Sequence, residues 1–473
     1  MIRSGRPVLA GVLVTLLVAL SAGGCTATPW DDKQPTQVFR PGAPGVGDPY
    51  FPTYGNGGYD VANYRLQVRY DPATDQLTGD VTIEATATQD LSRFNLDLSG
   101  LTVTSVQVDG VDAEHGRTED ELVVTPAKGL GKGSSFGVRV RYAGKPAPIT
   151  SPELGSGGLL HTSDGAIALG QPESASTWFP VNDHPLDKAT YQIEATVPAG
   201  LAALSNGVPG GSTTDAGWTT WRWAERAPMA SYLVTLVIGK YRVSTGAHAG
   251  KPLVTAIAEG LPAGGPAERS LARTGEIADF LATRFGPYPF DAYGGIAVAD
   301  SRIGYALETQ SRPVYGPAFF TTGPNLEVVA HELAHQWFGD SVSIGRWSDL
   351  WLNEGFASYA EWLWTEHDGG PSVQSMFEQE YAGTDWAEPA LDPGRTEIFS
   401  RAVYKRGALA VHALRRTVGD ETFFRILTGW TAERRNGNAT TDDFVAYAER
   451  VSGKRLRPLF DAWLSGTTAP PRP

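Results

Sequence analysis

The spacing of apolar residues changes along this chain of 473 residues, and that change limits the folds it can adopt. Between about Tyr50 and Val243, apolar residues recur at every second position in short runs that Gly, Asp and Pro separate. A period of two is typical of half-buried strands joined by turns, so an antiparallel β domain is predicted here. The clearest runs are Tyr64–Tyr70, Val81–Ala87, Val103–Val108 and Gly137–Tyr142.

After about Gly250, apolar residues recur at spacings of three and four, which is typical of amphipathic helices. Helices are expected over Ala267–Arg284, Leu326–Gly339, Asp349–Thr365, Gly407–Thr417, Asp420–Glu433 and Asp442–Val451. At about 100 to 200 residues per domain, the length suggests two or three domains. The predicted class is α+β and multidomain, with an N-terminal antiparallel β-sandwich-like domain over 48–246, a mainly helical domain over 247–466 and a tail over 467–473.

The charge balance argues against nucleic acid as a partner. The chain has 39 Lys and Arg against 52 Asp and Glu, a formal net charge of -13. The sequence contains no run of basic residues that would form a footprint for a phosphate backbone. We therefore expect no nucleic-acid interface.

Residues 1–24 have the features of a signal peptide. Arg3 and Arg6 precede the apolar stretch Val8–Leu20, which is too short to span a bilayer comfortably. The single cysteine, Cys25, follows in Ser-Ala-Gly-Gly-Cys, which resembles the processing site of bacterial lipoproteins. We expect a lipid-modified Cys25, a tether over residues 25–47 and a protein on the outer face of the cell membrane. The alternatives are a secreted protein cleaved near Ala22, with a free thiol, and a retained N-terminal anchor.

A metal site is predicted where His331 and His335 lie inside a helical pattern. Residues four apart project from the same face of a helix, so both imidazoles can reach one ion. Zinc accepts imidazole nitrogen and carboxylate oxygen, and catalytic zinc sites use three protein ligands. Glu354 opens the next predicted helix, nineteen positions after His335, and is the predicted third ligand. One Zn²⁺ per chain is therefore expected.

Glu332 follows the first ligand directly, so it borders the metal rather than coordinating it. Because zinc lowers the pKa of a bound water to about 7, Glu332 can act as the general base. A metal-bound His usually donates its other ring N–H to a carboxylate or carbonyl. The first candidate for this partner is Glu361, two helical turns after Glu354, and Asp340 and Asp349 are weaker ones. A plain salt bridge is the alternative for each of the three.

This part of the chain resembles the aminopeptidase N family of zinc peptidases, which belongs to the gluzincins. The family signature is His-Glu-x-x-His, then Glu after eighteen intervening residues, and it is met in full here. Gly304-Tyr-Ala-Leu-Glu-Thr-Gln310 is similar to the family's exopeptidase signature Gly-Ala-Met-Glu-Asn. The resemblance implies that Glu308 binds the free α-amine of the substrate. It implies further substrate contacts for the four preceding residues, Gly304, Tyr305, Ala306 and Leu307.

Two more segments carry the resemblance. Phe179-Pro-Val-Asn-Asp-His-Pro185 resembles the family's Phe-Pro-Cys-x-Asp-x-Pro, and Gln171 upstream of it is implied to help bind the amine. Tyr404-Lys-Arg-Gly-Ala408 resembles Tyr-x-Lys-Gly-Ala, with Arg406 in place of Lys. The resemblance implies that Tyr404 hydrogen-bonds the developing oxyanion. His184 has no partner at metal spacing, so a structural role is favoured for it.

The family's fold implies an N-terminal β domain packed on a thermolysin-like catalytic domain. Many members continue into a helical C-terminal domain that covers the active site, whereas a Pro-rich segment follows Trp463 here. An active site that is open on one side is therefore expected.

Three functions are compatible with these residues. The first is a zinc-dependent aminopeptidase acting on peptides with a free N-terminus. The second keeps the metal but uses it as an endopeptidase or on a non-peptide substrate, as in the leukotriene hydrolase branch of the family. The third is a surface binding module that holds zinc without turnover. Glu308 argues against the endopeptidase, and the competent residue at each catalytic position argues against the binding module.

Overall fold

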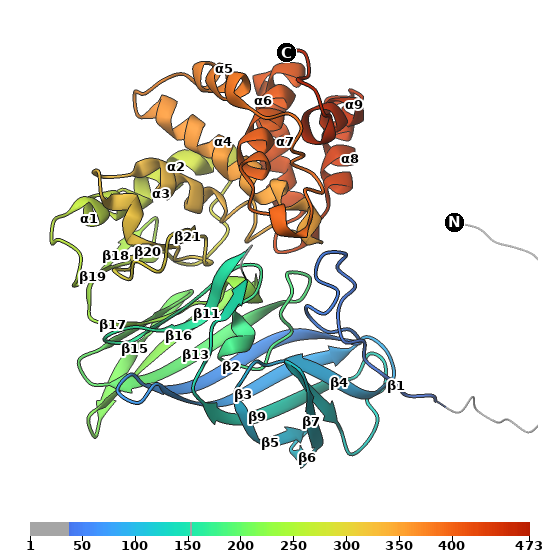
Figure 1. The fold of residues 1–473 in the computed structure, drawn as a ribbon, viewed down its shortest axis with the longest axis vertical. Helices are drawn as coiled ribbons and strands as arrows, with labels where there is room; N and C mark the ends of the chain where they lie inside the picture. Colours follow the sequence, from blue (N-terminus) through green and yellow to red (C-terminus); the bar gives the residue numbers. More distant parts are fainter. Residues whose placement is uncertain (1–36, 152–153) are drawn as a thin grey trace, which may run out of the picture. The chain divides into compact units, whose positions relative to one another are not determined.

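The structure is a computed structural model that describes residues 37–151 and 154–473. The predicted signal peptide and Cys25 lie outside the described residues. Strands dominate the first half of the chain and helices the second, drawn blue to green and yellow to red in Figure 1. This division confirms the predicted α+β class, and residues 39–473 form one compact unit.

An eight-stranded sheet is the largest element of the β half. Across the sheet its strands are β15 (Val208–Asp215), β16 (Trp218–Ala230), β13 (Lys188–Pro198), β2 (Tyr59–Asp71), β3 (Gln76–Ala87), β9 (Ser135–Gly144), β5 (Thr102–Val108) and β6 (Val111–Asp112). Buried and exposed residues alternate along β2 and β9, as the period of two predicts. However, β13 and β2 run parallel, with Tyr191 beside Tyr64, so the sheet is mixed rather than purely antiparallel.

Two smaller sheets complete the β half. The four-stranded sheet has the order β1 (Arg40–Pro41), β4 (Leu91–Asp97), β8 (Glu121–Thr125) and β7 (Glu114–Thr118). The five-stranded sheet has the order β10 (Ile149–Ser151), β11 (Gly155–His161), β12 (Ala166–Leu169), β17 (Leu236–Gly239) and β14 (Ala202–Ser205). Phe94 of β4 contacts Phe136 of β9 with ring centroids 5.4 Å apart, so the four-stranded sheet packs on the large one through aromatic side chains.

A further five-stranded sheet belongs to the second half. Its order is β18 (Tyr241–His248), β19 (Lys251–Ala258), β20 (Tyr293–Ala297), β22 (Val314–Tyr315) and β21 (Ala306–Leu307). The predicted boundary between residues 246 and 247 falls inside β18, which pairs along its whole length with β19. The second half therefore begins near Tyr241, because β18 continues the period-two pattern but pairs with the later sheet.

Nine α-helices follow or interrupt this sheet in the described part of the chain. They are α1 (Pro266–Leu271), α2 (Thr274–Phe285), α3 (Leu326–Ala334), α4 (Trp351–His367), α5 (Val373–Gly383), α6 (Gly407–Val418), α7 (Asp420–Glu433), α8 (Thr441–Ser452) and α9 (Arg457–Phe460). The single helix predicted over 267–284 is two helices, because the backbone of Arg273 departs from helical angles (φ -91°, ψ 4°). At the break, the Thr274 hydroxyl donates to the Leu271 carbonyl at 2.7 Å. A short two-stranded sheet pairs β23 (Ser343–Ile344) with β24 (Asn438–Ala439).

The described parts of the predicted tether and tail pack against the rest of the protein. Arg40 and Pro41 pair with β4, and the Gly57 amide donates to the Ala43 carbonyl at 2.9 Å, so the tether ends before β1 rather than at residue 47. In the tail, the Pro470 carbonyl accepts a hydrogen bond of 2.6 Å from the Tyr381 hydroxyl. Within residues 37–151 and 154–473, no helix combines the length and apolar character that crossing a membrane requires.

Buried polar contacts join the β half to the helical half. Asp48 accepts from the Trp347 amide at 2.9 Å and lies 3.4 Å from His184, so His184 has the predicted structural position. The Lys188 ammonium donates to the Asp340 carbonyl at 2.7 Å. The guanidinium of Arg312 donates to the carbonyls of β14 and its following turn. Each contact involves a side chain that would be costly to bury alone, so the two halves are held in one arrangement.

Arg406 joins the start of α6 to the segment around Trp463. Its buried guanidinium donates to the carbonyls of Trp463 at 2.6 Å and Trp386 at 3.1 Å, and also to those of Glu388 and Gly466. The five donors of a guanidinium suit four acceptors better than the three of an ammonium. This geometry explains why Arg occupies a position where the resembling motif has Lys.

We expect Arg406→Met to lower the free energy of unfolding by about 3 kcal/mol, because it leaves buried carbonyls without donors. The midpoint of urea unfolding, followed by tryptophan fluorescence, measures this loss. Arg406→Lys is the control and should lose less, since it keeps the charge and some donors. Equal midpoints for Arg406→Met and the unchanged protein would contradict this role.

Candidate active site

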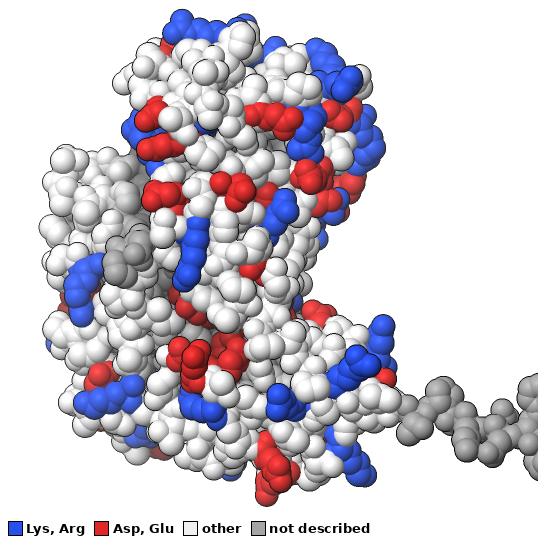
Figure 2. Space-filling model, turned by 45° about the vertical axis from the view of Figure 1, so that its right-hand side comes forward, with Lys and Arg blue, Asp and Glu red and all other residues white. Residues whose placement is uncertain are grey.

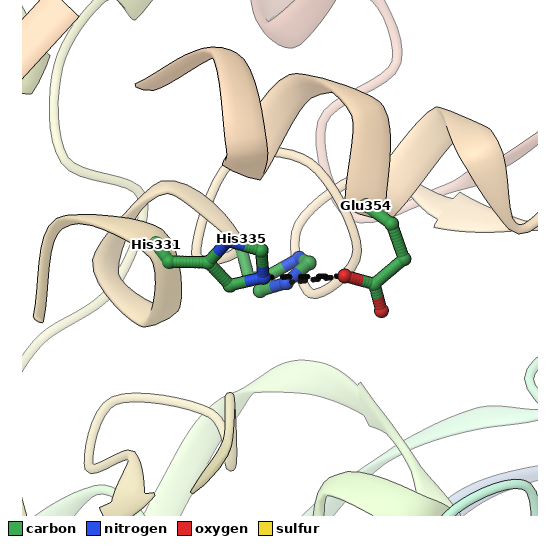
Figure 3. Close-up of side chains that lie close together, drawn as sticks. All are labelled: His331, His335 and Glu354. Atoms are coloured by element: carbon green, nitrogen blue, oxygen red, sulfur yellow. Dashed lines mark hydrogen bonds and ion pairs between the residues drawn. The ribbon is translucent and has the colours of Figure 1, made fainter. Parts of the chain in front are cut away.

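Helix α3 places the two predicted imidazole ligands on one face. The helix begins after Asn325, whose side chain accepts from the Val328 amide at 3.1 Å and caps the first turn. His331 lies in the helix and His335 at its C-terminal end, one turn later. Both side chains are buried, and their Nε2 atoms point to the same carboxylate (Figure 3).

That carboxylate belongs to Glu354, in the first turn of α4. Glu354 Oε2 lies 3.2 Å from His331 Nε2 and 3.3 Å from His335 Nε2. Ligands bonded to one tetrahedral zinc at about 2.0 to 2.2 Å lie about 3.3 Å from one another. The spacing of the three ligand atoms therefore fits a zinc ion, and together they form a group that could hold a metal.

The electrostatics of the site also fit a divalent cation. Burial disfavours the charged imidazole, but hydrogen bonds to Glu354 and Glu361 raise the pKa of His331 to about 9. For His335, burial is likewise outweighed by the charges of Glu354 and Glu308, which raise its pKa to about 10. Despite burial, the two imidazoles hold the pKa of Glu354 at about 2. The surroundings therefore favour two positive charges between these side chains, which one divalent cation supplies.

The outer ring nitrogens of both His are occupied. His331 Nδ1 lies 2.6 Å from Glu361 Oε1, and the other oxygen of Glu361 lies 3.0 Å from Lys405 Nζ. His335 Nδ1 lies 3.0 Å from the Phe338 carbonyl. Partners at Nδ1 fix the tautomer in which Nε2 is free to bind a metal.

Asp340 and Asp349 do not take part in this arrangement. Within the described structure, neither carboxylate oxygen of buried Asp340 has a hydrogen-bond partner. The chain curls back after α3, which brings the Phe338 carbonyl to His335 in place of Asp340. Asp349 instead accepts from Arg346 at 2.6 Å and from Thr441 at 2.6 Å, so it anchors the start of α4.

Close packing at two glycines brings Tyr404, the predicted donor to the oxyanion, near the metal ligands. A Cβ atom on Gly355 would lie 2.8 Å from the carbonyl carbon of Gly407, so α4 and α6 touch through their backbones. The π-helical turn Ala402–Arg406 precedes α6 and carries Tyr404. The Tyr404 ring stacks beside His331 with centroids 6.1 Å apart. Burial and nearby Glu354 raise the pKa of Tyr404 well above its ordinary value, so its hydroxyl keeps its proton and can donate it in a hydrogen bond.

Glu308 and Glu332 are the two buried carboxylates beside the ligands. Carboxylate oxygens of both lie within 4.8 Å of a His335 ring nitrogen and of one another. Burial raises the pKa of Glu332 to about 8 and also raises the pKa of Glu308. A cation at the ligands would stabilise the ionised form of both acids. The structure thus brings the predicted base and the predicted amine-binding group to one side of the metal ligands.

Glu308 is held in place by two residues that the sequence analysis did not identify. The Tyr232 hydroxyl donates to Glu308 Oε1 at 3.0 Å, and Gln336 Nε2 donates to the Glu308 carbonyl at 3.0 Å. Gln336 follows His335 directly, so α3 fixes both the metal ligands and Glu308. Tyr232 comes from the β half, 76 positions away, and no local pattern could have indicated it.

A cavity of about 340 Å³ opens over these groups. The predicted substrate residues that line it are Gln171, Tyr305, Ala306 and Glu308. Gly304 and Leu307 are absent from its described lining, and Leu307 is buried in β21. Lining residues that the sequence did not indicate are Phe319, Asn325, Glu327 and Val328. Glu327 and Val328 lie one turn before His331 on α3, and this spacing could have indicated that they line the cavity.

A mononuclear site of two His and one Glu, with a free carboxylate beside it, is the metal centre of a metal-dependent hydrolase. Residues 61–233 match the Peptidase M1 N-terminal domain and residues 270–463 the Peptidase family M1 domain. The M1 zinc metallopeptidase from Deinococcus radiodurans has the same fold, with a TM-score of 0.83 and 33% sequence identity, covering 90% of this chain and 99% of that chain. The chain therefore belongs to peptidase family M1.

Similar proteins with longer chains are aminopeptidases. Glutamyl aminopeptidase from Rattus norvegicus is 30% identical over 321 residues, which are 62% of this chain and 34% of that protein. Aminopeptidase M1 from Arabidopsis thaliana is 25% identical over 446 residues, 85% of this chain and 49% of that protein. The chain thus spans a third to a half of the length of these curated relatives. A variant of the Deinococcus radiodurans enzyme is solved with a Tyr-Ser-Ala substrate.

We expect Glu361→Ala to weaken zinc binding by about 10- to 100-fold, because His331 loses the acceptor that orients its ring. Competition with a fluorescent chelator measures the zinc affinity. Lys405→Met is the matched control, since it removes the other partner of Glu361 and keeps the contact with His331. If both variants bind zinc like the unchanged protein, Glu361 does not support the ligand.

Proposed function

We propose that this chain is a zinc-dependent aminopeptidase that hydrolyses the first peptide bond of peptides with a free N-terminus. The observation that carries the proposal is the place of Glu308, a buried carboxylate in the same cavity as the metal ligands. A carboxylate there can pair with the substrate's α-ammonium group. The first peptide bond would then lie at the metal, because the amine is held at a fixed distance from it.

Each of the other side chains has a role in this proposal. His331, His335 and Glu354 would hold one zinc ion, which when bound lowers the pKa of a coordinated water to about 7. Glu332 accepts the proton from that water and later returns it to the leaving amine. The Tyr404 hydroxyl donates to the carbonyl oxygen as it gains negative charge. Gln171, which lines the cavity, adds an acceptor oxygen for the amine.

The charge of the cavity supports a cationic end of the substrate. Its carboxylates are Glu308, Glu327, Glu332, Glu354 and Glu361, and its described lining contains no Lys or Arg. An N-terminal ammonium fits these surroundings, whereas a blocked N-terminus would leave the Glu308 carboxylate without a partner. Basic and acidic side chains are interspersed over the face shown in Figure 2, so this face offers no basic patch for a phosphate backbone.

The test compares one peptide with its N-acetylated form and adds a chelator. We expect chelator-sensitive release of the first residue from the free peptide and little cleavage of the blocked one. Equal cleavage of both peptides would favour an endopeptidase. Zinc binding without release of any amino acid from a panel of aminoacyl substrates would favour a binding module.

We also propose that the protein is exported and anchored by lipid at Cys25, on the strength of the N-terminal sequence alone. Metabolic labelling with a radioactive fatty acid tests the proposal. The label should be incorporated into the unchanged protein and lost in Cys25→Ser. An unlabelled protein in the medium would instead indicate simple secretion.

A further inference from the structure

A second hollow adjoins the metal cavity past the N-terminal turn of α3. This hollow, of about 580 Å³, lies against the end of α4, where Trp364, Thr365 and Asp368 line it. Asn325 and Glu327 line both the hollow and the metal cavity. The two spaces therefore adjoin at these two side chains, and a peptide that extends past them would lie in a groove made of both.

The groove has a direction because its amine-binding end is known under the proposed function. Glu308 lies close to His335, at the C-terminal end of α3. Glu327 lies on the opposite side of the ligands, four residues before His331 and so about 6 Å further along the helix. A substrate whose amine is held at Glu308 and whose first peptide bond is at the metal therefore continues toward Glu327.

Among the acidic side chains of this part of the groove, Glu327 is the one that has no Lys or Arg partner in the described structure. Asp368 is paired with Arg273 at 3.0 Å, and Glu361 is paired with Lys405 at 3.0 Å. Glu327 is exposed, and the contact it makes in the described structure is with the Thr365 hydroxyl at 3.1 Å. Neither space has a Lys or Arg among its described lining residues. A substrate side chain beside Glu327 therefore meets a carboxylate that no protein cation offsets.

We infer that Glu327 selects a basic side chain at the residue directly after the scissile bond. The inference rests on the proposed aminopeptidase function and specifies its substrates. A Lys or Arg side chain is long enough to lie along the apolar wall of Val328 while its charge reaches the carboxylate. An acidic side chain in the same place would be repelled. The helix N-terminus attracts anions, but the capping side chain of Asn325 already takes up one of its amides.

The test uses three peptide amides, Ala-Lys-Ala, Ala-Gln-Ala and Ala-Glu-Ala, which differ in the second residue alone. We expect kcat/KM for the Lys peptide to exceed that for the Glu peptide by about five- to tenfold at low salt, as a partly solvated ion pair gives. The preference should shrink as the ionic strength rises. In Glu327→Gln it should fall to about twofold or less, and Glu327→Lys should reverse it.

Glu114→Gln is the matched control, because Glu114 is exposed on β7 and the same charge is removed there. This variant should keep the full preference. Dissociation constants of the three peptides for zinc-loaded Glu332→Gln give a second readout that needs no turnover, and they should follow the same order. Equal values for the Lys and Glu peptides, or a preference that survives in Glu327→Gln, would overturn the inference. If none of the peptides is hydrolysed, the proposed function fails, and the dissociation constants still decide on Glu327.

Discussion

Glu332→Gln is expected to lower kcat by about a hundred- to ten-thousand-fold while the protein still binds one zinc ion. The change keeps the size of the side chain and removes its ability to accept a proton. Glu332 belongs to a second group that could hold a metal, with Glu308 and His335, but the atoms found at zinc-ligand spacing, 3.2 and 3.3 Å apart, are those of His331, His335 and Glu354. The loss should therefore appear in the chemical step and not in the zinc content.

Release of the first residue from an aminoacyl chromogenic substrate measures kcat, and atomic absorption measures the zinc. Glu114→Gln again serves as the matched control and should retain full activity. A zinc-loaded Glu332→Gln that turns over like the unchanged protein would show that another group takes the proton. Loss of zinc from Glu332→Gln would show that this carboxylate supports the metal as well.

The strands and helices in which buried residues recur at a regular spacing could be predicted from the sequence. The runs at 64–70 and 137–142 lie inside β2 and β9, and α7 has the predicted bounds of Asp420 and Glu433. Pairing between distant strands could not be predicted, because a period of two reports burial and not direction or partner. The parallel contact of β13 with β2 and the place of β18 in the later sheet are of this kind.

In the site, too, the residues placed by spacing within a helix could be predicted, and the contacts between distant elements could not. His331, His335 and Glu354 are set by the spacing of α3 and the start of α4, and the structure brings their ligand atoms together. The contact of Glu361 with His331 follows from helix periodicity in the same way. By contrast, Tyr232 reaches Glu308 from the β half, and the second hollow forms between the two helices. These depend on how separate elements pack, which residue spacing does not report.

Glu308→Gln is expected to lower kcat/KM for peptides with a free N-terminus by about 10- to 150-fold. The range corresponds to the loss of a hydrogen-bonded charge partner, worth about 1.5 to 3 kcal/mol. Gln keeps the side-chain size and an oxygen that accepts from the Tyr232 hydroxyl, so the cavity should keep its shape. What is lost is the negative charge that pairs with the substrate's ammonium group.

N-acetylated peptides distinguish this loss from a general defect. They carry no ammonium group, so Glu308→Gln should not lower their residual cleavage, and the ratio of free to blocked peptide should fall. Tyr232→Phe should cause a smaller decrease for the free peptide, because Glu308 keeps its charge and loses one donor. If Glu308→Gln instead lowers kcat/KM for both peptides equally, the carboxylate acts on the reaction itself, and selection of free N-termini must come from other residues of the cavity.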